Sequence, residues 1–353
     1  MSKRPPTYRD YKPQRLSRRQ LLRRTSAMGA LTAAGAYLAL APESAPLSRR
    51  DDSGLRSQPV AQPFALPDFR VAKRIGAGDV GLGRGGGVHE RMLKALDAVG
   101  GITHFIQPGD TVLVKPNVAF DRSPNLGATT NPALIETLLQ IVLVDARAAE
   151  VRVCDNPIES PADCFAKSGI RLATERAGGQ VYLPDSNAFD ILHTPGATLI
   201  ENWAFFKRPF RGVDKVIGIA PVKDHNLCHA SLGIKNWYGL LGGRRNQFHQ
   251  DIHEIVSDLS IMIRPTLTIL DGTHVLMENG PTGGDPSNVK DTHVILAGTD
   301  PVAMDAWAFE HLLERRGELE YLVQAEHKGS GLMDYRGRIK ELGSAQISTG
   351  EIA

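Results

Sequence analysis

The sequence predicts an α/β fold with a mainly parallel sheet and helices on both faces of the sheet. Short apolar segments alternate with segments of helical pattern between residues 111 and 315, which is typical of such folds. The apolar segments, such as TVLV at 111–114 and VRVC at 151–154, are rich in β-branched residues. Runs of this kind are characteristic of strands that are covered on both sides.

The first expected elements follow a glycine-dense stretch at residues 76–87, GAGDVGLGRGGG. A phosphate-binding loop would end in Lys followed by Ser or Thr, which this stretch lacks, so we expect a flexible loop. A helix is expected at 89–99 and a strand at 111–114. The next helix begins at Asn131-Pro132, because proline is favoured at the first helical position, and runs to about residue 146.

The same alternation continues to residue 315. We expect a strand at 151–154, a helix from Pro161 to about residue 177, and a strand at 181–183. Further strands are expected at 213–220, 267–270 and 293–297, with helices at 250–262 and 301–315. Polar residues follow four of these strands, namely Lys115, Asp155, Lys223 and Asp271. Since ligands in such sheets bind beyond the carboxyl ends of the strands, these residues indicate one shared site.

The charge of the chain is unevenly distributed. The 353 residues have a formal net charge of +2, yet the first 50 residues hold eleven Lys or Arg and two Asp or Glu. The remaining 30 basic and 37 acidic residues give the rest of the chain a net charge of −7. This excess of negative charge argues against binding to nucleic acid.

The N-terminal segment has the pattern of an export signal. Residues 17–23, SRRQLLR, are similar to the twin-arginine pattern, and an Ala/Gly/Leu stretch follows at 27–41. This stretch is too short and too weakly apolar for an ordinary membrane span. We expect residues 1–45 to be a twin-arginine (Tat) signal peptide that the Tat translocase recognises, and the protein to be periplasmic or otherwise extracytoplasmic. Residues 46–75 are expected to be a linker, and residues 76–345 a single α/β domain.

Residues 221–253 hold four of the eleven histidines. His225, Cys228 and His229 have side chains that bind zinc, nickel, copper or iron. In the alternative interpretation, Cys228 is a core residue, and the histidines form local hydrogen bonds or bind a substrate carboxylate. Later in this segment, Lys235 and Arg245 are suited to bind a carboxylate or a phosphate.

Other residues suggest acid–base or metal chemistry. Pro116 restricts Lys115 to an extended backbone, so the lysine could bind an anion or act as a base. Asp271 ends a strand, a common placement for a base or a metal ligand. Asp300 is expected to cap the helix that begins at Pro301. Asp305, inside that helix, is expected to point towards the site.

Six short motifs occur in a fixed order between Thr111 and Arg315. They are Lys115-Pro116-Asn117, Lys223-x-His225, Ile234-Lys235-Asn236-x-x-Gly239, Arg245-x-x-x-His249, Asp271-Gly272 before Gly280-Pro281, and Asp300-x-x-x-x-Asp305. Together they resemble the domain of unknown function 362 family, and this resemblance implies the family's architecture for residues 76–345. Many relatives carry ferredoxin-type cysteine motifs. This chain has no such cysteine run, so we expect it to hold no iron–sulfur cluster.

We therefore expect a Lys/His/Asp site for a small anionic substrate, with a divalent transition metal as an open option. The expected roles are catalytic for Lys115, Lys223, Lys235 and Asp271, substrate-binding for Asn117, Asn236 and Arg245, and metal-binding for His225, His249 and Asp305. The alternative is a non-catalytic periplasmic ligand-binding, metal-binding or redox accessory protein, which would work with a redox partner protein.

Overall fold

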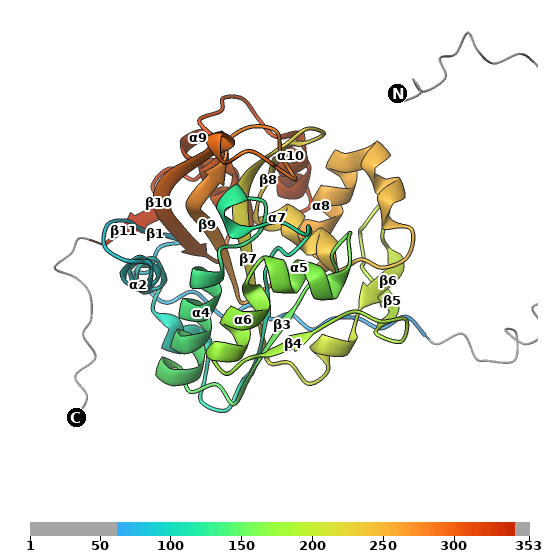
Figure 1. Cartoon of the computed structure of the whole chain (residues 1–353), viewed down its shortest axis with the longest axis horizontal. Coiled ribbons are helices and arrows are strands. Elements are labelled where there is room, and N and C mark those ends of the chain that lie inside the picture. Colours follow the sequence, from blue (N-terminus) through green and yellow to red (C-terminus); the bar gives the residue numbers. More distant parts are fainter. Residues whose placement is uncertain (1–61, 343–353) are drawn as a thin grey trace, which may run out of the picture. The chain divides into compact units, whose positions relative to one another are not determined.

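The computed structural model describes residues 62–342 (Figure 1), and the expected signal peptide lies outside them. The described residues from Pro63 onward cluster into one compact unit. Residues 63–75, which the sequence assigned to a linker, belong to this unit: Phe64 forms a β-bridge with Leu192, and Phe69 is buried. None of the helices in the described part of the chain is long and apolar enough to cross a membrane.

The described residues contain one large, mainly parallel sheet, as predicted. Its nine strands are β1 (Val80–Gly83), β2 (Thr111–Lys115), β3 (Glu150–Cys154), β4 (Gln180–Tyr182), β7 (Lys215–His225), β8 (His229–Ser231), β9 (Leu267–Leu276), β10 (Val289–Gly298) and β11 (Ile339–Glu341). The spatial order is β11-β1-β10-β9-β7-β2-β3-β4, and β8 pairs with the end of β7. β9, β7, β2, β3 and β4 are parallel, whereas β10 is antiparallel to β9 and β1. β5 (Phe189–His193) and β6 (Asn202–Phe206) form a separate hairpin.

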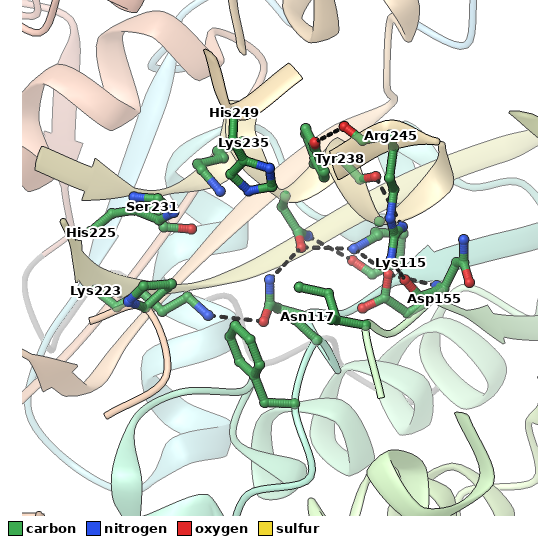
Figure 2. Close-up of a pocket in the computed structure, with 17 residues that line it drawn as sticks. Lys115, Asn117, Asp155, Lys223, His225, Ser231, Lys235, Tyr238, Arg245 and His249 are labelled. Carbon is green, nitrogen blue, oxygen red and sulfur yellow. Dashed lines mark hydrogen bonds and ion pairs between the residues drawn. The ribbon is translucent and has the colours of Figure 1, made fainter. Parts of the chain in front are cut away.

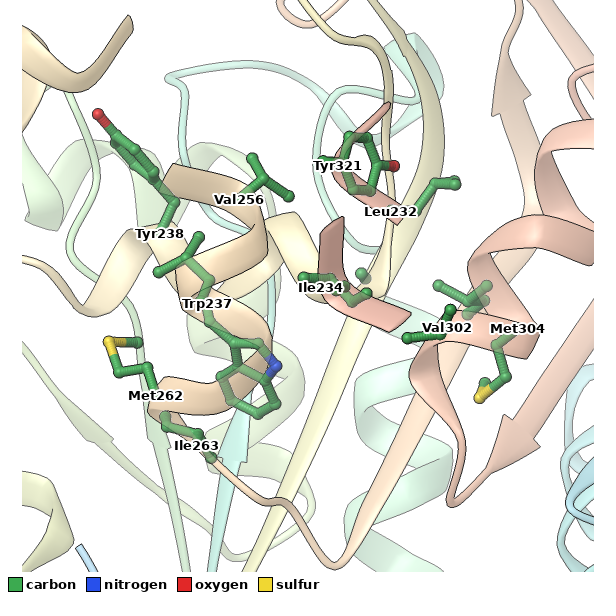
Figure 3. Packing of buried hydrophobic residues seen from close by; sticks show 14 of the residues in the cluster. Leu232, Ile234, Trp237, Tyr238, Val256, Met262, Ile263, Val302, Met304 and Tyr321 are labelled. Atoms are coloured by element: carbon green, nitrogen blue, oxygen red, sulfur yellow. The ribbon is translucent and has the colours of Figure 1, made fainter. Parts of the chain in front are cut away.

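Helices cover both faces of the sheet, which confirms the second part of the prediction. One face packs against α2 (Val88–Ala98), α3 (Ile102–Phe105), α4 (Pro132–Gln140), α5 (Pro161–Lys167) and α6 (Ile170–Arg176). The other packs against α7 (Gly233–Asn236), α8 (Ile252–Met262), α9 (Pro301–His311) and α10 (Glu320–His327), as Figure 3 shows in part. Val112 and Val114 belong to the first core and Leu113 to the second, because side chains alternate along a strand.

The predicted loop at residues 76–87 is wrong in its centre, where the chain forms the buried strand β1. Gly81 and Gly83 allow α2 to lie directly on this strand. A Cβ atom at either glycine would collide with the backbone carbonyl of Ala95 or Arg91 in α2. The two glycines therefore permit the close contact between β1 and α2. The predicted helix over 161–177 is also interrupted at Gly169, whose φ of +74° separates α5 from α6.

The parallel strands bring the polar residues of the middle of the sheet to one edge. Lys115 is the last residue of β2 and pairs with Gly218 of β7, and β3 ends just before Asp155. β7 continues through Pro221 to His225, well past its pairing with β2. Lys223 and His225 therefore extend over the same edge that Lys115 and Asp155 occupy.

The contact of β1 with α2 predicts that serine at Gly81 destabilises the protein, whereas serine at Gly87 does not. We expect Gly81→Ser to lower the free energy of unfolding by about 2 kcal/mol or more, because the new side chain would overpack the contact with α2. Gly87→Ser is the matched control. No atom lies within 4 Å of a Cβ at Gly87, which precedes α2 where serine is a favoured cap. Urea denaturation measures both, and equal stability of the two variants would contradict this account of β1.

Candidate functional site

A polar cavity of about 70 Å³ lies at the carboxyl ends of β2, β3 and β7 (Figure 2). Its opposite wall is formed by α7 and by two 3₁₀ helices, η5 (Trp237–Leu240) and η6 (Arg245–Asp251). The cavity brings together eight of the ten predicted site residues: Lys115, Asn117, Lys223, His225, Lys235, Asn236, Arg245 and His249. Three residues without a predicted role, Asp155, Ser231 and Tyr238, also line the cavity.

Lys115 and Asp155 form a buried ion pair at the base of the cavity. Their closest atoms, Lys115 Nζ and Asp155 Oδ1, are 2.8 Å apart, and both side chains are almost fully buried. Lys115 Nζ also donates to the Pro116 carbonyl at 2.8 Å and to Asn236 Oδ1 at 2.9 Å. Burial lowers the pKa of Lys115, and the carboxylate of Asp155 opposes that change. These three acceptors use all three ammonium hydrogens, so Lys115 has no hydrogen left to donate to a ligand.

Two asparagines connect Lys115 to Lys223. Lys223 Nζ donates to Asn117 Oδ1 at 3.1 Å and to the Ala128 carbonyl at 2.6 Å. Asn117 Nδ2 in turn donates to Asn236 Oδ1 at 3.3 Å, and Asn236 Nδ2 donates to two backbone carbonyls. The amide of Asn236 is therefore fully used. Its contacts make it a positioning residue for the lysines, and its contact with substrate stays a prediction.

Lys223 and Lys235 share the cavity but differ in their contacts. No ion pair of Lys223 is found within residues 62–342, and burial, followed by the charges of Lys235 and Lys115, holds its pKa well below the usual range. The amine of Lys235 has neither a hydrogen bond nor an ion pair in the same part of the chain, and it lies 5.5 Å from the centre of the Tyr238 ring. Burial lowers the pKa of Lys235 as well, with Lys115 and Arg245 acting in the same direction. Among the described residues, Lys235 is thus the lysine of the cavity whose amine has no hydrogen-bonding partner.

The backbone fixes the two histidines in opposite tautomers. His225 Nδ1 accepts a hydrogen bond from the Leu227 N–H at 3.1 Å. Burial, followed by the nearby lysines, lowers the pKa of His225 to about 2, so this imidazole is neutral and carries its hydrogen on Nε2. His249 Nδ1 lies 2.9 Å from the Asn246 carbonyl and must donate to it, which leaves Nε2 of the neutral ring without hydrogen. The cavity is therefore lined by one imidazole N–H and one imidazole lone pair.

Arg245, which the sequence suggested as a clamp for the substrate, binds the loops around the cavity. Its Nη2 donates to the carbonyls of Asn156 at 2.7 Å and Pro157 at 3.0 Å, and its Nη1 donates to the Leu241 carbonyl at 3.1 Å. The guanidinium is mostly buried, and burial lowers its pKa. Arg245 still contributes positive charge to the cavity, but most of its N–H groups are already bound.

Asp271 and Asp305 do not line the cavity, contrary to the expectation from the sequence. The carboxylate of Asp271 accepts hydrogen bonds from the Asn131 N–H at 2.8 Å and from Thr273 at 2.5 and 3.1 Å. Asp305 accepts from the N–H groups of Gly233 at 2.8 Å and Ile234 at 3.0 Å, at the start of α7. Burial raises the pKa of Asp305 to about 7. Both carboxylates therefore hold backbone in place.

The predicted metal ligands do not form a metal site in the described structure. Residues 62–342 contain no group of three or more His, Cys, Asp or Glu side chains placed to hold a metal ion. His225 does not fit such a site in its present tautomer, because Nδ1 accepts from the backbone and Nε2 carries hydrogen. The alternative interpretation of Cys228 is confirmed, since its side chain is buried in the core, whereas His229 is exposed. Asp300 caps α9 as expected, accepting from the Ala303 N–H at 2.9 Å.

The sequence held a signal for Asp155 but little for Tyr238. Asp155 directly follows β3, so it ends at the same sheet edge as Lys115. Tyr238 follows the Ile234-Lys235-Asn236 motif in a short 3₁₀ helix, where no periodicity shows which way the ring points. Its hydroxyl donates to the Arg245 carbonyl at 2.5 Å. Tyr238 thereby links the two 3₁₀ helices that form the wall.

Comparisons with known proteins identify the family. The model of the domain of unknown function (DUF362) matches residues 112–310. A thylakoid-associated protein of Synechocystis sp. is 27% identical over 227 residues, which are 60% of this chain and 65% of that protein. The lactate racemase apoprotein of Thermoanaerobacterium thermosaccharolyticum is 14% identical with a TM-score of 0.39, over 71% of this chain and 60% of its own. A Thermotoga maritima protein is 13% identical with a TM-score of 0.30, over 56% and 52% of the two chains.

The ion pair under the cavity predicts a large effect of removing one partner. We expect Lys115→Met to lower the free energy of unfolding by about 3–5 kcal/mol, because it leaves the buried carboxylate of Asp155 without its counterion. The double variant Lys115→Met/Asp155→Asn should be less destabilised, because it removes that charge. Denaturant unfolding measures both variants.

Lys167→Met is the matched control, since Lys167 pairs with Asp121 at 3.5 Å on the surface. Removing an exposed pair of this kind costs about 1 kcal/mol at most. If Lys115→Met were tolerated as well as Lys167→Met, the ion pair would not be a principal support of the site.

Proposed function

This chain belongs to the DUF362 family, and we propose that its cavity is the active site of an enzyme that acts on a small anionic molecule. The chain spans about 65% of the length of the curated relative that it matches. Neither this relative nor the family specifies a reaction for this chain. The proposal therefore rests on the side chains of the cavity.

The observation that carries the proposal is the imbalance of charge around the cavity. Among residues 62–342, four basic side chains line it, Lys115, Lys223, Lys235 and Arg245, whereas the one acidic residue in the lining is Asp155. Asp155 is already paired with Lys115. Burying positive charge without a counterion is unfavourable, so an anion that enters the cavity would relieve this cost. The site is therefore suited to a ligand that brings negative charge.

The free hydrogen-bonding groups of the cavity suit an anion as well. Lys235 has an untied amine, charged Lys223 would have one N–H beyond its two protein acceptors, and His225 has its Nε2–H. Donors of this kind bind carboxylates and phosphates strongly when water is excluded. The lone pair of His249 Nε2 adds a proton acceptor, which is the minimum needed for general acid–base catalysis.

The size of the cavity limits the group that it takes. About 70 Å³ leaves room for a few water-sized groups, such as a carboxylate with its neighbouring carbon. A wider cavity of about 330 Å³ adjoins it and shares the residues Asn156, Ile158 and Arg245. The rest of a longer molecule would fit in this outer space.

The depressed pKa values of Lys223 and Lys235 predict that anion binding takes up protons. A bound anion favours the charged amines and so raises these pKa values. We therefore expect affinity for acetate and phosphate to be highest at low pH and to fall as the pH rises and the lysines lose their protons. Calorimetry in buffers of different ionisation enthalpy would measure both the affinity and the protons taken up.

Lys223→Met should weaken this binding roughly 10- to 100-fold, the loss expected for one charged hydrogen bond. Lys290→Met is the matched control, because Lys290 lies half-exposed on the surface in a pair with Glu314. Binding of equal strength in all three proteins, or binding without uptake of protons, would argue against the proposed anion site.

We also propose that residues 1–45 direct export through the Tat translocase, on the evidence of the sequence pattern around Arg18 and Arg19. The double substitution Arg18→Lys/Arg19→Lys should keep the protein in the cytoplasm, since the pathway reads the paired arginines. Fractionation of cells that produce the full chain would measure this. Arg23→Lys/Arg24→Lys is the control, and export that survives the first substitution would refute the proposed signal.

A further inference from the structure

We infer that Lys235 is a nucleophile that forms an imine with the carbonyl carbon of a 2-oxo acid. This inference rests on the proposed function, because the carboxylate of such a molecule would be the anion that the cavity binds. It goes further by assigning a covalent step and a class of substrate to the site.

The contacts of the three lysines of the cavity single out Lys235. Lys115 Nζ has three acceptors and Lys223 Nζ has two, all of them protein oxygens. Within residues 62–342 the amine of Lys235 has none, although the residue is only partly exposed. Figure 2 shows the Lys235 side chain directed into the cavity beside His249. An amine that attacks a carbonyl needs a free lone pair and an open path, and Lys235 alone has both.

The surroundings of Lys235 favour the neutral amine that a nucleophile requires. Lys115, Lys223 and Arg245 line the same cavity, and the one carboxylate there is committed to Lys115. A lysine that is desolvated or lies next to other cations loses its proton more readily, which is a recurring way of activating lysine for imine formation. Burial, followed by the charges of Lys115 and Arg245, lowers the pKa of Lys235 accordingly.

The same charges select a carbonyl compound that carries an anion. The cavity has room for a carboxylate with the atoms next to it, and Lys223 lies in the wall with one hydrogen available when it is charged. In a 2-oxo acid the carbonyl carbon is bonded directly to the carboxylate. Binding of the carboxylate by Lys223 would therefore place an electrophilic carbon within the small cavity that Lys235 enters. A neutral ketone or aldehyde would lack this attraction.

The two histidines provide for the proton transfers of the step. The Lys235 nitrogen forms a bond to the carbonyl carbon as the C=O π bond breaks, and the developing oxyanion accepts a hydrogen bond from His225 Nε2–H. His249 Nε2 takes a proton from the nitrogen and passes it to the oxygen, which gives a carbinolamine. His249, protonated again from solvent, then donates to the hydroxyl, which leaves as water while the nitrogen lone pair forms the C=N bond. One amine, one carbonyl and one proton thus give one iminium ion and one water.

Reductive trapping with pyruvate tests the inference on the full chain. Sodium cyanoborohydride reduces an iminium ion to a stable secondary amine, so the protein should gain the mass of one reduced pyruvate. Peptide mapping should place the adduct on Lys235. Acetone, which has the ketone but lacks the carboxylate, should give at least about tenfold less product if an interaction of about 1.4 kcal/mol or more with the carboxylate is lost. Absence of an adduct, or adducts spread over surface lysines, would overturn the inference.

Variants separate this inference from the proposed function. Lys235→Arg removes the nucleophile, so it should form no adduct, while acetate binding to the unchanged protein reports the anion site separately. Lys290→Arg, on the surface, should behave like the unchanged protein. If the unchanged protein bound acetate but gave no pyruvate adduct, the anion site would stand and the imine would be refuted. Loss of acetate binding in the unchanged protein would refute the proposed function itself. Mapping the adduct on the unchanged protein needs no variant, so a Lys235→Arg protein that failed to fold would not prevent a decision.

Discussion

The buried ion pair between Lys115 and Asp155 is the constraint on which the candidate site depends. It joins the ends of two neighbouring strands, and both partners also hold backbone: Lys115 the carbonyl of Pro116, and Asp155 the N–H of Val118 at 2.6 Å. Through Asn236 the pair reaches α7 on the opposite wall. A charge pair that is withdrawn from water must satisfy every donor and acceptor, and here it does so by ordering the loops around the cavity.

On the wall opposite this pair, the carboxylate of Asp305 lies outside the cavity but positions Lys235, the most exposed of the three lysines in the cavity. Asp305 of α9 accepts hydrogen bonds from the first backbone N–H groups of α7, the element that carries Lys235. Gly233 allows this approach, since a Cβ there would lie 3.0 Å from Asp305 Oδ1. α7 has only four residues, too few for a stable helix by itself. Its geometry is therefore imposed by α9 and by Asn236, and with it the direction in which Lys235 points.

Most of the predicted residues share one cavity because parallel strands end at one edge of the sheet. The residues after β2 and within β7 could be assigned to that edge from strand order alone, and Asn236, Arg245 and His249 lie in the loops that face it. Asp271 lies outside this cavity, and its position along a strand does not give the face of the sheet on which it lies. Its neighbour Leu270 belongs to one core, so Asp271 points towards the other face, where α4 begins.

Roles were harder to predict than positions, because they depend on contacts that no motif records. Arg245 donates hydrogen bonds to three loop carbonyls. These are backbone atoms, so the sequence does not reveal the contacts. Residues 76–87 contain a strand because Gly81 and Gly83 meet the backbone of α2, a contact between segments whose packing cannot be read from glycine content alone. In both cases the decisive contact is with backbone atoms of a distant segment. Local sequence patterns report side chains and cannot reveal such a contact.

The opposite tautomers of His225 and His249 place a hydrogen-bond donor and a hydrogen-bond acceptor at different positions in the cavity wall. A molecule between them meets a hydrogen-bond donor on one side and an acceptor on the other, with lysine charge at a third position. These three contacts differ in kind, and hydrogen bonds to the backbone hold the two histidines. A substrate with a stereocentre can satisfy all three in one handedness, whereas its mirror image must give up at least one. The hydrogen bonds of Leu227 and Asn246, both outside the cavity, thus give the site the means to distinguish enantiomers.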